Sequence, residues 1–129
     1  MREIKFRGKC IDDGEWVYGS LLQWKCWMSA IAVNNPSDSN VLMTNAVYPD
    51  TVGQYAGLKD KNGKDVWEGD LLSSDGIVCE VAYDEYRASF HLIIDKIKGS
   101  VPLGDMMRSF GFQVIGNRWD NPELLEDGK

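Results

Sequence analysis

Short apolar runs separated by glycine-containing turns recur along this 129-residue chain. Residues 4–10 alternate between apolar or small side chains and basic ones, and residues 16–22 resume an apolar run after the turn Asp12-Asp13-Gly14-Glu15. Alternation with a period of two is typical of a strand that has one face in solvent. Glycine permits the positive φ of a tight turn. The N-terminal segment therefore predicts a β-hairpin.

The same pattern continues toward the C-terminus. Asn62-Gly63 is a strong signal for a two-residue hairpin turn, and residues 77–83 and 88–94 predict a further pair of strands. Residues 27–33 predict a strand, residues 34–40 an exposed loop, and residues 41–47 fit no element clearly. Helical turns are expected only near residues 104–108 and 121–125. Many short strands joined by tight turns favour a mainly β, antiparallel barrel or sandwich.

Composition favours a folded protein in the cytoplasm. Hydrophobic residues make up 43% of the chain, and 5 Trp, 5 Tyr and 4 Phe can fill a core. No apolar run approaches the roughly 18 residues of a membrane span, so we expect no membrane association. The charged, alternating start Met1-Arg2-Glu3-Ile4-Lys5 lacks the apolar stretch of a signal peptide. Cytoplasmic residence follows as the expectation.

Charge disfavours non-specific nucleic-acid binding but leaves one local candidate. The net charge is −6, and the acidic excess lies in residues 66–129. Affinity for the phosphate backbone requires a basic surface that releases counterions. The basic face of the first strand is the best local candidate for a polyanion, with candidate residues Arg2, Lys5, Arg7 and Lys9. The alternatives are a solvated strand face or pairing with the acidic half of the chain.

The residues with reactive side chains do not form a catalytic or metal-binding pattern. His91 is the only histidine and lies inside a predicted strand, which favours a structural or surface histidine over a catalytic one. Cys10, Cys26 and Cys79 are odd in number and widely spaced, so we expect three reduced thiols and no zinc site.

Carboxylates and nucleotide motifs lead to the same expectation. Glu68 and Asp70 flank Gly69, and Asp84-Glu85 stand at a predicted hairpin tip, where acidic groups usually solvate turns. Neither a P-loop nor a Gly-x-Gly-x-x-Gly motif is present. We therefore expect no enzyme activity, no catalytic residue, no metal and no cofactor.

Three segments, in this order and spacing, resemble one known family. They are residues 4–7 and 14–19 (IKFR, GEWVYG), residues 51–64 running into 67–70 (TVGQYAGLKDKNGK, WEGD), and residues 114–117 and 121–125 (VIGN, NPELL). The chain resembles the YopX family of bacteriophage and prophage proteins over nearly its whole length. Residues 25–46 carry no part of this resemblance.

The resemblance implies a fold and an origin but no activity. It implies a β-rich fold whose C-terminal part is an SH3-like barrel, in a single domain over residues 1–129. A subdivision into residues 1–58 and 59–129 is an open alternative. The family also implies a phage or prophage origin and a bacterial host cell, and it supplies no catalytic residue or cofactor.

These observations favour a non-enzymatic protein-binding or adaptor module that acts on a host or phage protein. The alternative is a nucleic-acid-binding module that uses the basic N-terminal strand. Self-association is a further expectation, because the segment around Lys25 and Cys26 is apolar on both possible strand faces. The candidate residues for a homo-oligomer are Trp24, Trp27 and Met28, unless the chain after Val33 folds back and covers them.

Overall fold

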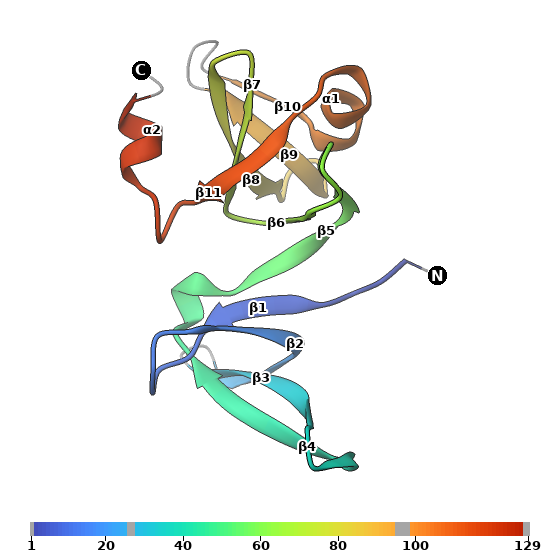
Figure 1. Cartoon of the computed structure of the whole chain (residues 1–129), viewed down its shortest axis with the longest axis vertical. Coiled ribbons are helices and arrows are strands. Elements are labelled where there is room, and N and C mark those ends of the chain that lie inside the picture. Colours follow the sequence, from blue (N-terminus) through green and yellow to red (C-terminus); the bar gives the residue numbers. More distant parts are fainter. Residues whose placement is uncertain (1, 26–27, 95–98, 128–129) are drawn as a thin grey trace. The chain divides into compact units, whose positions relative to one another are not determined.

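Antiparallel strands dominate the structure, as the sequence predicted. The computed structural model describes residues 2–25, 28–94 and 99–127 and, within these ranges, all side chains except those of residues 24, 25, 39, 126 and 127 (Figure 1). One sheet has six strands in the order β4-β3-β2-β1-β5-β6, and the other has five in the order β10-β9-β8-β7-β11.

The elements are short, and the two α-helices lie near the C-terminus. The first sheet contains β1 (Phe6–Lys9), β2 (Trp16–Lys25), β3 (Met28–Asn35), β4 (Asp38–Val47), β5 (Gly53–Lys59) and β6 (Asp65–Trp67). The second contains β7 (Asp70–Ser74), β8 (Ile77–Asp84), β9 (Ser89–Ile94), β10 (Gly99–Pro102) and β11 (Gln113–Asn117). The helices are η1 (Pro49–Thr51), α1 (Leu103–Ser109) and α2 (Glu123–Asp127).

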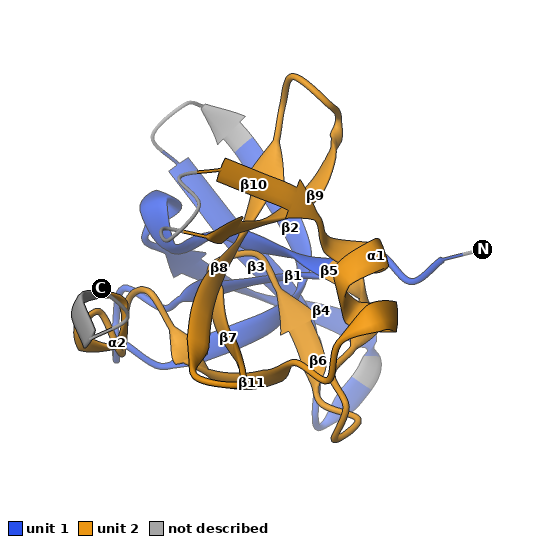
Figure 2. Cartoon of the chain, turned by 90° about the horizontal axis from the view of Figure 1, so that it is seen from above, with its two compact units in different colours: residues 1–55 blue, residues 56–129 orange. Residues whose placement is uncertain are grey.

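The chain divides into two compact units, residues 1–55 and 56–129 (Figure 2). The division falls inside β5, and the alternative subdivision after Leu58 would fall inside the same strand. In the part of the chain that the structure describes, no helix is long and apolar enough to cross a membrane.

The predicted N-terminal hairpin is present. β1 and β2 pair antiparallel from Phe6↔Gly19 to Lys9↔Trp16. Gly14 has a φ of 73°, and its N–H donates to the Cys10 carbonyl at 2.9 Å, which closes the turn. The glycine in the turn therefore supplies the left-handed backbone that the sequence pattern indicated.

β2 changes partner at Gly19. It pairs with β1 over Trp16–Gly19 and then with β3 from Ser20↔Ala32 onward. A Cβ atom at Gly19 would overlap the carbonyl oxygen of Ala32. Glycine therefore allows the close backbone approach at which the strand passes from one neighbour to the other.

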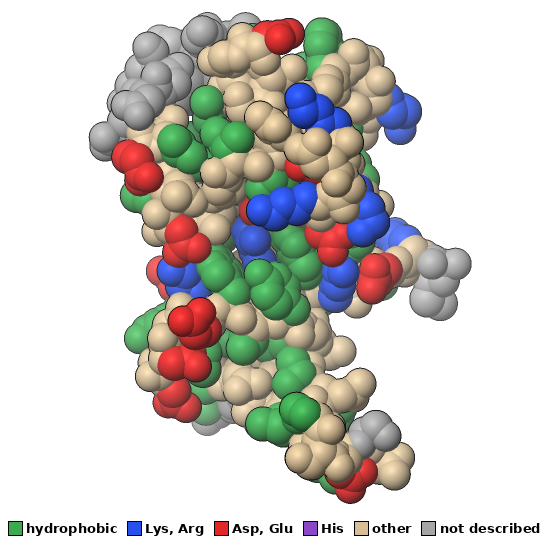
Figure 3. Space-filling model, in the orientation of Figure 1, with side chains coloured by type: hydrophobic (Ala, Val, Ile, Leu, Met, Phe, Trp, Pro, Cys, Tyr) green, Lys and Arg blue, Asp and Glu red, His purple; other side chains and the backbone are tan. Residues whose placement is uncertain are grey.

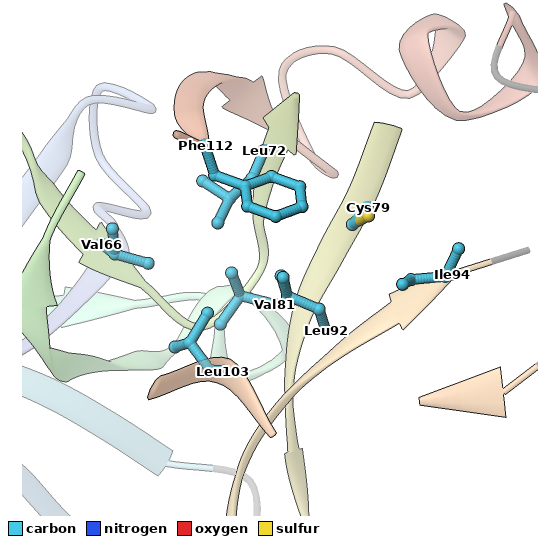
Figure 4. Packing of buried hydrophobic residues seen from close by; sticks show 8 residues of the cluster. All are labelled: Val66, Leu72, Cys79, Val81, Leu92, Ile94, Leu103 and Phe112. Carbon is cyan, nitrogen blue, oxygen red and sulfur yellow. The ribbon is translucent and has the colours of Figure 1, made fainter. Parts of the chain in front are cut away.

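The C-terminal unit has an apolar core of its own. The buried cluster comprises Val66, Leu72, Cys79, Val81, Leu92, Ile94, Leu103 and Phe112 (Figure 4). Strands β6 to β9, helix α1 and the segment that leads into β11 each contribute to it. The SH3-like barrel is not confirmed, because within the described ranges the strand order is open from β10 to β11.

Asp60 fixes the turn between β5 and β6 to β11. Its Oδ1 accepts the N–H groups of Asn62 (2.8 Å) and Lys64 (2.9 Å), and its Oδ2 accepts that of Val114 (2.9 Å). Burial opposes ionisation of the carboxyl, but these three N–H groups and the Lys64 charge outweigh it and hold the pKa of Asp60 below its usual value. One buried carboxylate thus connects two segments about 50 residues apart.

Gly69 is covered by an aromatic ring. Its φ is 91°, and a Cβ atom at this position would overlap the ring of Trp119. The Gly69 N–H donates to Val81 at 2.8 Å, and its carbonyl accepts the Arg118 N–H at 2.9 Å. The residues Trp67-Glu68-Gly69-Asp70, which carried part of the family resemblance, therefore form a turn built to receive the segment after β11.

Candidate functional site

β4 is the longest strand at an edge of either sheet. It has ten residues and stands at the end of its sheet beside β3. The Cys10↔Val47 bridge and the bond from the Ile11 N–H to the Ala46 carbonyl (2.9 Å) occupy the last two residues of its outer edge, so residues 38–45 form the open part. The other edge strands are β6, β10 and β11, with three, four and five residues. An edge strand presents unpaired N–H and C=O groups that another strand can bind. β4 therefore offers a longer binding edge than any other strand in the described ranges.

The outer part of the β3–β4 hairpin extends beyond β2. The β2–β3 pairing ends at Ser20↔Ala32, whereas β3 and β4 stay paired to Asn34↔Leu42 and, after a register shift, at Asn35↔Asp38. In the described part of the chain, residues 33–43 therefore form a ribbon of two strands, which we call the β4 arm. Figure 1 shows this ribbon as the end of the hairpin that carries β4.

The β4 arm exposes apolar side chains on both of its faces. Val41, Leu42 and Met43 are 46%, 63% and 43% exposed. Consecutive residues of a strand point to opposite faces, so Leu42 lies on one face and its two neighbours on the other. An isolated two-stranded ribbon is marginally stable in water. The β4 arm therefore combines a free edge with apolar surface on either side of it.

Side-chain hydrogen bonds fix the turn at the tip of the arm. The Asn35 Oδ1 accepts the N–H of Ser37 at 2.9 Å, and the Asp38 Oδ1 accepts the N–H of Asn40 at 3.0 Å. Asn and Asp favour turns by bonding to the backbone two residues ahead. The exposed loop expected at residues 34–40 is instead a tight turn between two strands, because these bonds close it locally.

The whole hairpin carries very little charge. Charged residues make up 26% of the chain, whereas residues 28–47 contain only Asp38. Figure 3 shows uncharged side chains over this hairpin, with an acidic group near its tip. Edge strands usually avoid pairing by means of charged residues or proline. Neither protects residues 39–45 of β4.

The basic residues in β1 and just before it are engaged with aromatic rings. The Lys5 Nζ lies 4.6 Å from the ring centroid of Tyr55 and 3.6 Å from a carboxylate oxygen of Glu3. The Arg7 guanidinium lies 4.6 Å and the Lys9 Nζ 5.4 Å from the ring of Trp16. Cation–ring contacts of this kind stabilise the packed arrangement of such side chains.

The solvated basic face predicted for the first strand is wrong at Arg7. This side chain is only 5% exposed, because its guanidinium packs over the Trp16 ring. Lys5 and Lys9 are half-buried, and Arg2 is exposed. Alternation in the sequence identified the face that Lys5, Arg7 and Lys9 share, but it did not predict that the Trp16 ring would cover Arg7.

The proposed self-association residues are described only in part. Trp27 and the side chain of Trp24 lie outside the described residues. Met28 is half-buried and opens β3, where it pairs with Lys25. The structure thus places Met28 in the hairpin that carries β4, whereas the exposed apolar residues at its far end were not identified from the sequence. The sequence feature that could have identified this exposed apolar surface is the uncharged run Val41-Leu42-Met43-Thr44.

The reactive residues are mostly buried. Cys10 and Cys79 are buried free thiols, and burial raises the pKa of Cys79 to about 11. Cys26 lies outside the described residues. His91 is buried, with its Nε2 3.0 Å from the Ser89 hydroxyl. Among the described residues, no group of three or more His, Cys, Asp or Glu side chains is placed to hold a metal ion.

The candidate carboxylates serve turns. The buried Asp70 accepts the Trp67 N–H at 2.8 Å, and Asp84 pairs with Arg87 at 2.8 Å. Bonding to Arg87 holds the pKa of Asp84 below its usual value. Both residues therefore have the turn-forming role that their sequence positions favoured.

Comparison with known proteins gives a family and a fold. A model of the YopX family, described as YopX protein, matches residues 5–126. The crystal structure of protein EF1440 from Enterococcus faecalis is similar to this chain, with a TM-score of 0.63 and 23% sequence identity. The match covers 97% of this chain and 99% of that chain, and at this identity it shows the fold alone. The comparison with curated proteins found no match.

Proposed function

The chain belongs to the YopX family, and we propose that it is a non-enzymatic protein-binding module that takes up an extended strand along the free edge of β4. The observation that supports this proposal is the open edge of β4 over residues 38–45, which includes the exposed side chains of Val41, Leu42 and Met43. In strand addition, backbone hydrogen bonds provide affinity, and alternate side chains provide specificity. The arm offers both kinds of contact.

The setting that we propose follows from the family resemblance. The protein is phage- or prophage-encoded and acts in the cytoplasm of a bacterial host. A host or phage protein that adds a strand to β4 would make this chain an adaptor. Buried His91 and the buried thiols of Cys10 and Cys79 support a non-enzymatic role, because a catalytic group must reach its substrate.

The test compares capture of partners by three forms of the chain from a nuclease-treated bacterial lysate. Leu42→Lys places a charge at the centre of the exposed apolar run. The matched control is Tyr86→Lys, at a position 95% exposed in the turn between β8 and β9. We expect wild type and Tyr86→Lys to retain the same partner and Leu42→Lys to lose it. Equal capture by all three would overturn the proposal.

Nucleic-acid binding through β1 is the second candidate. Lys5 and Lys9 lie beside the rings of Tyr55 and Trp16, a combination that single-stranded nucleic acids can use. The buried Arg7 and the net charge of −6 count against it. Fluorescence anisotropy with a labelled single strand tests it, since real binding through β1 would weaken in Lys5→Glu and with added salt.

A further inference from the structure

We propose that the strand taken up by β4 is β4 of a second copy of this chain, so that two β4 arms pair antiparallel about a two-fold axis. This inference rests on the function proposed above, because it uses the same edge and names its occupant. A two-fold contact of this kind is isologous, since each copy contributes the same surface. The resulting sheet continues from β3 and β4 of one copy into β4 and β3 of the other.

The edges of the molecule differ in how they are protected. β10 is short and ends with Pro102, which has no N–H to donate. The pairing of β11 with β7 contains a register shift between Val114 and Gly116, and such irregularities discourage further pairing. β4 keeps a regular register with β3 from Ser29↔Val47 to Asn34↔Leu42, and its register shifts only beyond Leu42, toward the tip. Residues 42–45 of β4 are therefore regular and open, which is what pairing with an identical strand requires.

One register brings all the exposed apolar residues of the arm together. In an antiparallel pair related by a two-fold axis perpendicular to the sheet, one residue faces its own copy. If Leu42 is that residue, Val41 of each copy faces Met43 of the other, and Leu42 faces Leu42. Directly opposite residues share a face, so both faces of the paired arms gain apolar contacts. Other registers leave part of this run opposite polar residues.

Charge selects the same region for contact between two copies. The acidic excess that makes the net charge −6 lies in residues 66–129, so repulsion opposes association most through the surface of that part of the chain. Within residues 28–47 the only charge is Asp38, at the tip of the arm. In the register centred on Leu42, the two Asp38 residues lie four positions on either side of the axis, about 26 Å apart along the strands. This separation exceeds the Debye length of about 8 Å at physiological salt, so their repulsion is screened.

Sedimentation velocity over micromolar concentrations tests the assembly. We expect the wild type to dimerise and Leu42→Lys to weaken the dimer by at least about tenfold, because two ammonium groups would then face each other. Tyr86→Lys adds the same charge at an exposed position of the other unit and should leave dimerisation unchanged. Circular dichroism of each variant establishes that it is folded.

Oxidative cross-linking tests the register in a Cys26→Ser background, in which the native Cys10 and Cys79 are buried. Leu42→Cys should form a disulfide-linked dimer rapidly, because residue 42 faces its own copy. Met43→Cys should cross-link at least about tenfold more slowly, because opposite cysteines must bring their Cα atoms within about 7 Å. Both substitutions are at exposed positions, so neither removes a core contact.

Three outcomes would overturn the inference. A wild type that stays monomeric at every concentration has no second copy on β4. A dimer that Leu42→Lys leaves intact assembles elsewhere, and equal cross-linking at residues 42 and 43 contradicts the register. If the monomeric wild type still captures a partner that Leu42→Lys loses, strand uptake stands and only the occupant is wrong.

Discussion

The C-terminal unit and the β4 arm bury their apolar residues to opposite extents. In the C-terminal unit, eight apolar side chains pack into one buried cluster, and its edge strands are short or irregular. In the β4 arm, an open edge strand leaves three consecutive apolar side chains exposed. The same residue types thus support folding in one region and are available for contact in the other. Leu72 and Leu42, 0% and 63% exposed, represent the two cases.

The largest loss of folding stability on substitution is expected in the buried cluster. Leu72→Ala should lower the free energy of unfolding by about 4 kcal/mol, since it removes buried methyl groups and leaves a cavity. Urea unfolding followed by tryptophan fluorescence measures the change. A loss below about 1 kcal/mol would show that this cluster is not the stability core that its burial indicates.

Gly69→Ala is expected to cost about 3 kcal/mol. The new methyl group meets the Trp119 ring, and the backbone must keep its φ of 91°. Thermal unfolding of Gly69→Ala, Trp119→Ala and the double variant separates the two causes. The double variant should be more stable than the sum of the single effects predicts, because Trp119→Ala removes the overlap. Strict additivity would contradict the ring contact.

Asp60→Asn should cost about 2 kcal/mol at neutral pH. An amide offers one acceptor oxygen where the carboxylate offers two, so at least one of the N–H groups of Asn62, Lys64 and Val114 loses its partner. Urea unfolding at pH 7 measures the loss, with Asp84→Asn as a control at an exposed turn.

The pH dependence of this effect has a definite sign. The pKa of Asp60 is lowered in the folded protein, so the unfolded chain binds more protons near the usual carboxyl pKa. Its stabilisation is complete above about pH 4 and is lost as the pH falls through the folded pKa. The difference between wild type and Asp60→Asn should therefore shrink below about pH 4. A difference that grows on acidification would contradict the hydrogen bonds to the carboxylate.

The smallest loss of folding stability on substitution is expected in the β4 arm. Leu42→Ala is the same substitution as Leu72→Ala, yet it should change the unfolding free energy of the monomer by no more than about 0.5 kcal/mol. Dilute samples, in which no dimer forms, provide this measurement. If Leu42→Ala destabilised the dilute protein as much as Leu72→Ala, the arm would be part of the core and not a surface for contact.

The sequence predicted the elements in which local signals agree. Alternation and the turn at Gly14 indicated the β1–β2 hairpin, and Asn62-Gly63 lies in the turn between β5 and β6. Residues 41–47 gave no clear prediction because their two faces are not separated into apolar and polar sets. Both faces are exposed near the tip of the arm, so the core imposes no alternation there.

Contacts between distant residues explain what the sequence did not predict. The ring of Trp16 covers Arg7 only after β2 has paired with β1, so alternation alone placed Arg7 in solvent. The bond from Val114 to Asp60 spans 54 positions, and no local pattern announces it. The candidate edge was likewise visible only once the order of strands in the sheet had placed β4 at its end.

The hydrogen bonds of Asn35 and Asp38 at the tip of the arm have a consequence for the speed of recognition. They close the turn from within the hairpin, so the arm has its binding shape before any partner arrives. When a strand binds to a preformed edge, the protein that carries the edge loses little conformational entropy. Binding also does not wait for a slow rearrangement of that protein. Association can then proceed at a rate governed by diffusion and orientation. The lifetime of the complex depends on how many residues of β4 have paired with the partner strand.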